Sequence, residues 1–113
     1  MRRDFRRKLV LPHADLVYEL LTPGLQGRLG MVRTTIAPLF SNEDQPFRHT
    51  GEEVVYVLAG SLVLHVQDTT YELARGDTAT YDSGLPHWWH VPSPSEPAEL
   101  IAAMSPPSFQ AWL

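Results

Sequence analysis

Short stretches of alternating apolar and polar residues run along the chain and are separated by turn residues. Such alternation over four to eight residues is typical of half-buried β-strands, and no stretch carries a convincing helical stripe. The pattern predicts nine short strands, over residues 8–11, 16–21, 29–37, 53–59, 61–67, 70–74, 77–81, 87–91 and 99–104. Strands of this length and spacing indicate a single all-β domain, either a β-sandwich or a small barrel.

The amino-acid composition excludes several classes of protein but does not indicate a function. The chain has 113 residues, which suits one domain, and a hydrophobic content of 43% that is ordinary for a globular protein. It has no cysteine, which excludes disulfides and thiolate metal sites. No apolar stretch approaches 18 residues, and the basic N-terminal run is not followed by the apolar segment of an export signal. We therefore expect a cytoplasmic protein that is not bound to a membrane.

Charge is unevenly distributed along the sequence. The first eight residues carry five basic side chains and one acidic side chain, whereas the rest of the chain carries four basic and twelve acidic ones. The resulting balance of −8 would repel nucleic acid, so this domain is not expected to contact DNA directly. We interpret the basic run as a charged strand edge or chain end; the alternative is an arm that contacts phosphate.

Two adjacent glutamates, Glu52 and Glu53, lie at the start of the strand predicted at residues 53–59. Residues two apart on a strand share a face, so Glu53 lies on the same face as Val55 and Val57. Glu52 then points the other way, toward water. If the valines face the interior, Glu53 is a buried carboxylate, which needs hydrogen bonds or a cation. His49, four residues earlier, is placed to share that cation.

A second polar stretch, GLPHWWHV, occupies residues 84–91. Alternation places His87 and Trp89 on one face of the predicted strand, and Trp88 and His90 on the other. His87 is therefore expected to face inward and His90 outward. If the two strands lie side by side, the side chains of His49, Glu53 and His87 converge.

Two neutral imidazoles and one carboxylate form a ligand set that leaves coordination positions open on a metal ion. This is the facial-triad set of non-haem Fe(II), and it also accepts Mn(II), Co(II), Ni(II) or Zn(II). We therefore predict a divalent metal site (Fe, Mn, Ni or Zn) at His49, Glu53 and His87, and the sequence does not choose among these metals. The alternative is a polar pocket in which these residues bind one another or an organic ligand directly.

At these residues the sequence resembles the cupin family. The first cupin motif reads His-x-His, three or four residues, Glu, six residues, Gly, and the matching positions are Phe47-Arg48-His49, Glu53 and Gly60. The second motif reads Gly, five residues, Pro-x-Gly, two residues, His, three residues, Asn, and its matches are Gly76, Gly84 and His87. The resemblance covers about residues 25–108. It implies a single cupin domain over residues 1–113, folded as a small β-barrel of the double-stranded β-helix or jelly-roll type.

Three positions depart from the cupin motifs. Phe47 replaces the leading histidine of the first motif, so the common site of three histidines and one glutamate is not available. Asp82 replaces the proline of the second motif and Val91 replaces its asparagine, and neither belongs to the ligand set.

The segments HTGEEVVYVLAG and YELARGDTATYDSGLPH resemble those of a narrower group of cupins. These are the ligand-sensing domains that follow a helix-turn-helix in bacterial transcriptional regulators. The segments are also similar to those of hydroxypropylphosphonate epoxidase, an iron enzyme with the same two-domain layout. The first hypothesis is therefore a sensor domain that reaches DNA only through an N-terminal helix-turn-helix outside this chain. The alternatives are a mononuclear metal-dependent oxygenase, epoxidase or isomerase, and an interaction module. No catalytic residue is predicted beyond the three ligands.

A small-molecule ligand is expected inside the domain, because aromatic-lined cavities with a few polar groups are the usual binding sites. Phe47 and Trp89 are expected to face the interior, and Tyr56 and Tyr81 are further candidates for ligand contact. The pattern does not fix the facing of the two tyrosines, nor that of Arg33, His65 and Met104; His65 is expected to be a structural residue. A homodimer is also expected, since strand edges and exposed aromatic residues favour pairing.

Overall fold

The computed structural model describes residues 1–11, 16–24, 26–44, 46 and 48–107, and only the backbone of residues 9 and 11. Within these residues there are nine strands and one short 3-10 helix, η1 (Arg3–Phe5). The strands are β1 (Lys8–Leu11), β2 (Leu16–Leu20), β3 (Gly30–Ile36), β4 (Glu52–Ala59), β5 (Ser61–Val66), β6 (Thr69–Ala74), β7 (Thr78–Asp82), β8 (His87–His90) and β9 (Ala98–Ser105). Every stretch predicted from the alternation contains one strand, and the ends agree to within one residue. No helix in this described part is long and apolar enough to cross a membrane.

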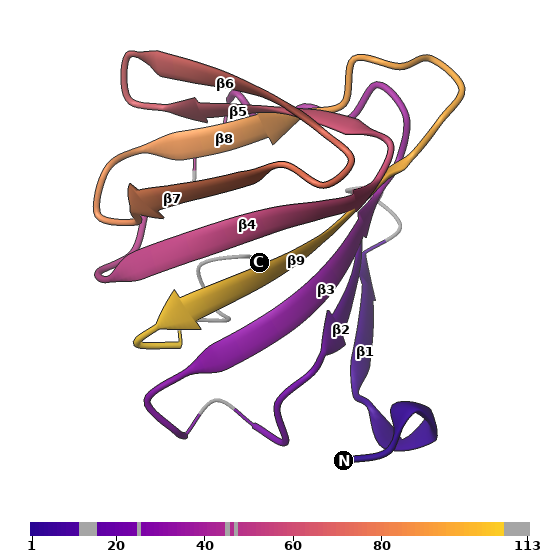
Figure 1. The fold of residues 1–113 in the computed structure, drawn as a ribbon, viewed down its shortest axis with the longest axis vertical. Helices are drawn as coiled ribbons and strands as arrows, with labels where there is room; N and C mark the ends of the chain where they lie inside the picture. The colour runs from indigo at the N-terminus through magenta and orange to yellow at the C-terminus, as the bar shows by residue number, and fades with distance from the viewer. Residues whose placement is uncertain (12–15, 25, 45, 47, 108–113) are drawn as a thin grey trace.

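The strands form two antiparallel sheets, as Figure 1 shows. The larger has the order β1-β2-β3-β9-β4-β7, and the smaller has the order β6-β5-β8. The last strand, β9, lies between β3 and β4 and pairs with both, so it joins the N-terminal strands to the centre of the molecule. This nearly all-β, two-sheet architecture confirms the predicted fold class.

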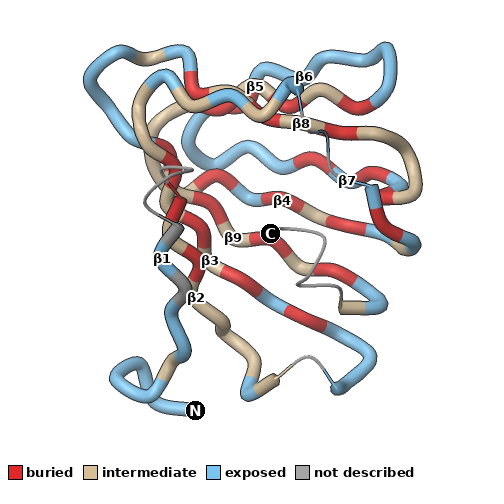
Figure 2. Tube along the Cα trace, turned by 180° about the vertical axis from the view of Figure 1, so that it is seen from behind, coloured by how far each residue is buried: buried red, intermediate tan, exposed pale blue. Residues whose placement is uncertain are grey.

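Burial alternates along the strands, as the alternating colours in Figure 2 show. Buried apolar side chains from both sheets meet in one core. In β4 the buried positions are those of Glu53, Val55 and Val57, while Glu52 and Tyr56 are exposed. The face assignment made from the sequence for Glu53 and Glu52 is therefore confirmed. Because the interior of the domain is apolar, a polar side chain buried there needs hydrogen-bond or ionic partners.

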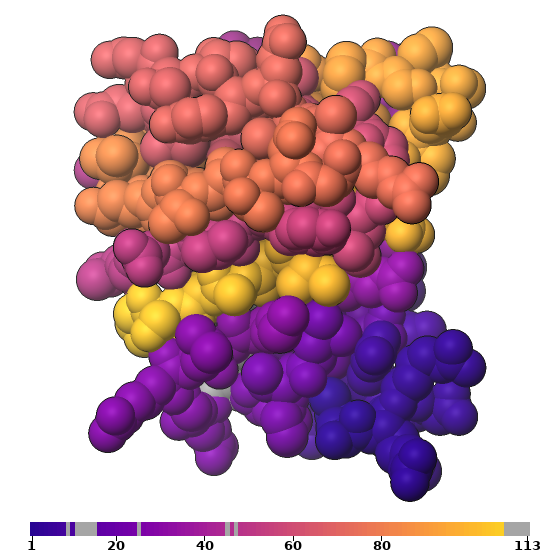
Figure 3. All heavy atoms as spheres, in the orientation of Figure 1, coloured from indigo at the N-terminus to yellow at the C-terminus, as the bar shows by residue number. Residues whose placement is uncertain are grey.

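The basic N-terminal run, residues 1–8, contains η1 and leads into the edge strand β1, which begins at Lys8 and pairs with β2. In the space-filling view of Figure 3 this segment occupies one corner of the molecule beside β2 and β3. Arg6 forms an ion pair with Glu19 on β2, with 3.1 Å between Nη1 and Oε1. The run thus lies along a sheet edge, as the strand-edge interpretation expects.

Candidate metal centre

Glu53 lies at the beginning of β4 and its side chain is completely buried. In the sheet register it lies directly opposite Tyr81 on β7 and Met104 on β9. The Tyr81 hydroxyl donates a hydrogen bond to Oε2 of Glu53. A carboxylate without solvent contact is costly unless its oxygens are paired, so this bond accounts for one of the two oxygens.

His49 lies in the segment that leads into β4. Two backbone hydrogen bonds join this segment to the turn between β7 and β8: the His49 N–H donates to the Ser83 carbonyl and the Ser83 N–H donates to the Gly51 carbonyl, each at 2.9 Å. Gly51 has a φ of 130°, which residues with a side chain rarely adopt. The bend at Gly51 returns the chain so that the buried His49 ring lies beside Glu53, and the two bonds bring the His87 turn to the same place.

His87 begins β8 and is 1% exposed. Its Nδ1 lies 2.9 Å from the Leu85 carbonyl oxygen. Because a carbonyl only accepts, Nδ1 carries the hydrogen, and the lone pair of the neutral ring is on Nε2. Burial lowers the pKa of His87, against smaller opposing effects of the Leu85 hydrogen bond and the Glu53 charge. The ring is therefore held as a neutral imidazole, the form that binds metals.

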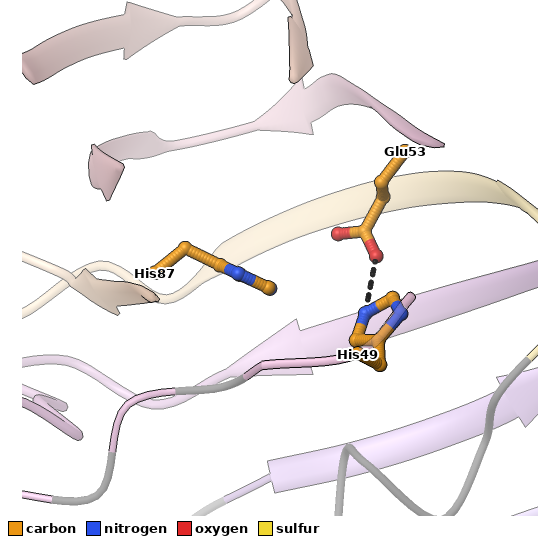
Figure 4. Close-up of side chains that lie close together, drawn as sticks. All are labelled: His49, Glu53 and His87. Atoms are coloured by element: carbon orange, nitrogen blue, oxygen red, sulfur yellow. Dashed lines mark ion pairs between the residues drawn. The ribbon is translucent and has the colours of Figure 1, made fainter. Parts of the chain in front are cut away.

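The three side chains come together although they belong to different parts of the fold. One donor atom from each of His49, Glu53 and His87 lies within 4.8 Å of the other two. Figure 4 shows the Glu53 carboxylate directed toward the His49 ring, with the His87 ring to one side of both, and the dashed line joins His49 Nε2 to Glu53 Oε1 at 3.2 Å. The imidazole centroids of His49 and His87 are 5.5 Å apart, and the rings are tilted by 73°. The convergence expected from the sequence is thus present in the structure.

The polar atoms at this point lack good partners among the described residues. Glu53 Oε1 and both ring nitrogens of His49 are buried and make no aligned hydrogen bond, so the 3.2 Å approach is an ion-pair contact only. Buried polar groups without partners are rare in folded proteins and often mark a missing ion or water. A cation among the three donors would satisfy them, and the donor set is one that binds divalent transition metals. The residues present therefore fit a metal.

Two tyrosines complete the electrostatic environment of Glu53. Burial is the main cause that raises the pKa of Tyr81 well above its ordinary value, and the charge and hydrogen bond of Glu53 add to it. Burial and then the Glu53 charge likewise raise the pKa of Tyr18, which is completely buried on β2. Both phenols therefore keep their protons at neutral pH, so the Tyr81 hydroxyl remains a donor to Glu53.

The other residues singled out from the sequence divide into two sets. Trp89 and Tyr81 are buried in the interior, and the Tyr81 ring lies 5.1 Å from that of His87. Tyr56 is 42% exposed on the opposite face of β4, so the structure does not bring it to the metal-centre residues. The reason is the same alternation that buries Val55 and Val57. Phe47 lies outside the described residues.

The sequence pattern did not fix the facing of three further side chains, and the structure shows where each of them lies. Met104 is buried, whereas Arg33 is half-buried and forms an ion pair with Glu99, with 3.0 Å between Nη2 and Oε2. His65 is half-buried and pairs with His90. None of the three belongs to the ligand set.

Sequence reasoning missed Tyr18, whose hydroxyl group is influenced by Glu53. The signal was present, because Leu16, Tyr18 and Leu20 share one face of β2 and a tyrosine within such an apolar face has a polar end to satisfy. What the pattern of β2 could not supply is the proximity to Glu53, which depends on β3 and β9 lying between β2 and β4.

The fold and the buried His-Glu-His group define a cupin. The chain belongs to the cupin domain family, which matches residues 34–104. Among curated proteins it is similar to the HTH-type transcriptional regulator PuuR of Escherichia coli strain K12, with 27% identity over 111 residues. That alignment covers 90% of this chain and 59% of the regulator, so the chain spans about three-fifths of the length of its relative.

Solved structures of low sequence identity share the fold. An RmlC-like cupin from Shewanella frigidimarina aligns with a TM-score of 0.79 and 17% identity over 97% of this chain and 92% of that one. The Fe(II) form of HppE aligns with a TM-score of 0.75 and 23% identity, over 92% of this chain and 58% of that one. An HTH_3 family transcriptional regulator from Vibrio cholerae aligns with a TM-score of 0.70 and 19% identity, over 86% of this chain and 55% of that one.

Proposed function

We propose that this chain is a small-molecule-binding cupin domain that holds a divalent metal at His49, Glu53 and His87 and serves as the ligand-sensing part of a bacterial helix-turn-helix transcriptional regulator. The observation that carries the proposal is the convergence of three buried metal-binding side chains in a chain that aligns along 90% of its length with such a regulator. The shared fold of the Vibrio cholerae regulator is consistent with it.

The residues of the chain are arranged to hold a metal before it arrives. The Leu85 carbonyl fixes the tautomer of His87, and the Tyr81 hydroxyl holds Oε2 of Glu53 so that Oε1 is directed at His49. Such supporting hydrogen bonds orient metal ligands and raise their affinity. When bound, a divalent ion would supply Lewis acidity and open coordination positions for an oxygen- or nitrogen-bearing ligand.

The ligand would lie against the aromatic side chains of the interior. Tyr81 is buried against the His87 ring, Trp89 is buried on the same face of β8 as His87, and we assign ligand contact to both. Phe47 is retained as a ligand contact from its position two residues before His49. Tyr56 is not included, because it faces solvent.

DNA contact would be made outside this domain. The described residues contain no α-helix that could enter a major groove, since η1 has three residues. A helix-turn-helix elsewhere in the regulator would therefore contact the DNA. A homodimer remains part of the proposal because such regulators commonly bind symmetric half-sites.

The experiment is ligand capture followed by identification. Chain loaded with Fe(II) is incubated with a mixture of small polar metabolites, washed, denatured and analysed by mass spectrometry. A sensor returns a compound unchanged, and capture is lost in Glu53→Gln but kept in the matched variant Glu52→Gln, whose side chain is exposed on the same strand. If wild-type chain retains no compound, or if Glu53→Gln retains the same compound, the sensor proposal is wrong.

A second function is favoured by the similarity to Fe(II) HppE and by the open positions that the ligand set leaves. In that case the domain is a mononuclear metal-dependent enzyme, an oxygenase, epoxidase or isomerase. The same capture experiment separates the two functions when it is run aerobically and anaerobically. An enzyme converts the compound that it binds, and a sensor does not.

A further inference from the structure

The outer face of the smaller sheet carries a second group of imidazoles. His65 on β5 and His90 on β8 project from the face opposite to that of His87, because the burial of Leu64 and Trp89 fixes the inner face of these strands. Figure 1 shows β5 and β8 side by side. In their register His65 lies opposite Trp88 and His90 lies opposite Val63, so the two histidines are diagonal neighbours.

The distance between the two rings suits a shared metal ion. His65 Nε2 lies 3.1 Å from His90 Nδ1, and the ring centroids are 5.1 Å apart. Two imidazole nitrogens bound to one tetrahedral ion at about 2.0 Å each are separated by roughly 3.3 Å. Each ring keeps a second nitrogen that can carry its hydrogen, so both facing nitrogens can present lone pairs to the ion.

The pair is held in place by its neighbours. The His65 ring stacks on the Trp88 indole with 3.6 Å between centroids and 7° between planes. Thr70 Oγ1 lies 3.2 Å from His65 Nδ1, where it can accept the hydrogen of that nitrogen. His65 Nε2 then carries the lone pair. A ligand whose tautomer and ring plane are already fixed loses little freedom when it binds.

The surroundings favour a cation. The segment that carries Ser41, Asn42 and Glu43 runs along β8, since Ser41 bridges His90 and the Asn42 side chain accepts a hydrogen bond from the Trp89 N–H at 2.8 Å. The exposed Glu43 carboxylate acts electrostatically on His65. Burial and the neighbouring His90 lower the pKa of His65, more than Glu43 raises it, so its ring is neutral at pH 7.

We propose that His65 and His90 form a second metal site that binds Cu(II), Ni(II) or Zn(II), on the outer face of the smaller sheet and separate from His49, Glu53 and His87. Imidazole pairs select these late transition metals over Mn(II), which prefers carboxylates. Water and the Glu43 carboxylate would complete the coordination. The site is independent of the proposed sensing function.

The test titrates the chain with Ni(II) or Cu(II) and measures tryptophan fluorescence at each addition. An ion on His65 would lie close to the stacked Trp88 indole and quench its emission. The inner site proposed above would bind the same ions on the side of the sheet that carries the buried Trp89, so the test is made in the His87→Gln background. The variant is His87→Gln/His90→Gln, which leaves the His65–Trp88 stack in place. His87→Gln is the matched control, because it removes a ligand of the inner site on the same strand. Circular dichroism checks that both variants fold.

We expect quenching in His87→Gln, in which the inner site is removed. In His87→Gln/His90→Gln the midpoint should rise by at least about tenfold, a loss no smaller than that caused by removing a supporting partner of a metal ligand. Equal midpoints in His87→Gln and His87→Gln/His90→Gln would overturn the proposal. So would the absence of quenching in His87→Gln, since the ion would then occupy the inner site alone.

Discussion

At the scale of single residues, Glu53 is the side chain whose position demands the most explanation. An ionised carboxylate with no solvent contact is unfavourable unless charges and hydrogen bonds compensate it. The structure supplies the Tyr81 hydroxyl and the His49 ring, and the remaining oxygen has no aligned donor among the residues described. The arrangement is therefore better suited to binding a cation than to stabilising the fold.

Replacing Tyr81 by phenylalanine tests the support given to Glu53. Tyr81→Phe removes the hydrogen bond to Oε2 and should weaken divalent-metal binding by about 10- to 100-fold, the usual effect of losing such a partner. The matched control is Tyr56→Phe. Tyr56 is exposed and follows the buried Val55 on β4, so this variant should bind metal like wild type. Isothermal titration calorimetry measures both; equal affinities for the two variants would contradict the role assigned to Tyr81.

The lowered pKa of His87 predicts how stability depends on pH in the metal-free protein. Burial keeps this ring neutral in the folded state at pH values where the unfolded chain, with a pKa near 6.5, takes up a proton. The unfolded state then binds more protons, so the free energy of unfolding decreases as the pH falls below about 6.5. Urea unfolding at pH 7.5, 6.5 and 5.5 measures it, and His87→Gln should show a weaker decrease. A contribution from His87 that grows as the pH falls would refute this.

The alternation of the sequence predicted most residue positions and missed those set by distant contacts. It placed Glu53 and His87 inside and Glu52 and His90 toward the outside, because two-residue periodicity alone decides these facings. The same rule, applied to Tyr56, would have excluded it from the ligand contacts, since it has the parity of Glu52. The pairing of His65 with His90 could not be predicted, because it depends on which strand neighbours β5.

At the scale of elements, the strands could be predicted but their partners could not. Each strand has a local signal in its alternation, whereas the position of β9 between β3 and β4 depends on pairings across most of the chain length. The resemblance to cupins supplied that topology. The smaller sheet contributes His87 and the larger contributes Glu53, so the candidate metal ligands come together only once both sheets have formed.

The bend at Gly51 is the local feature that joins these elements. A Cβ at Gly51 would collide with the backbone oxygen of Ser105, and its φ of 130° is unfavourable for any other residue. We expect Gly51→Ala to lower the free energy of unfolding by about 3 kcal/mol or more and to weaken metal binding, because His49 moves with the bend.

Gly76→Ala is the matched control for this prediction. Gly76 also has a positive φ, of 89°, but a Cβ there would meet nothing within 4 Å. Its cost should be limited to about 1–2 kcal/mol of backbone strain, with unchanged metal binding. Chemical denaturation of both variants gives the comparison, and equal losses of stability would show that the contact with Ser105 is unimportant.

At the scale of the whole molecule, the domain combines a buried donor set with a surface of uneven charge. Most of the chain is acidic, and the basic N-terminal run lies around η1 and the start of β1 at one corner. An acidic surface of this kind would repel nucleic acid, as the proposed sensing role expects of this domain. The similarity to a transcriptional regulator, of which the chain covers 59%, is one reason for that proposal.

The central claim is that His49, Glu53 and His87 bind one divalent metal ion inside the domain. The most direct test measures Mn(II) binding by electron paramagnetic resonance. Mn(II) is chosen because it favours the carboxylate-containing inner site over an imidazole pair. Wild type and Glu52→Gln should each bind one Mn(II) per chain, and Glu53→Gln should bind at least about tenfold more weakly. If wild type binds no Mn(II), or if Glu53→Gln binds it as tightly as Glu52→Gln, the metal centre described above does not exist.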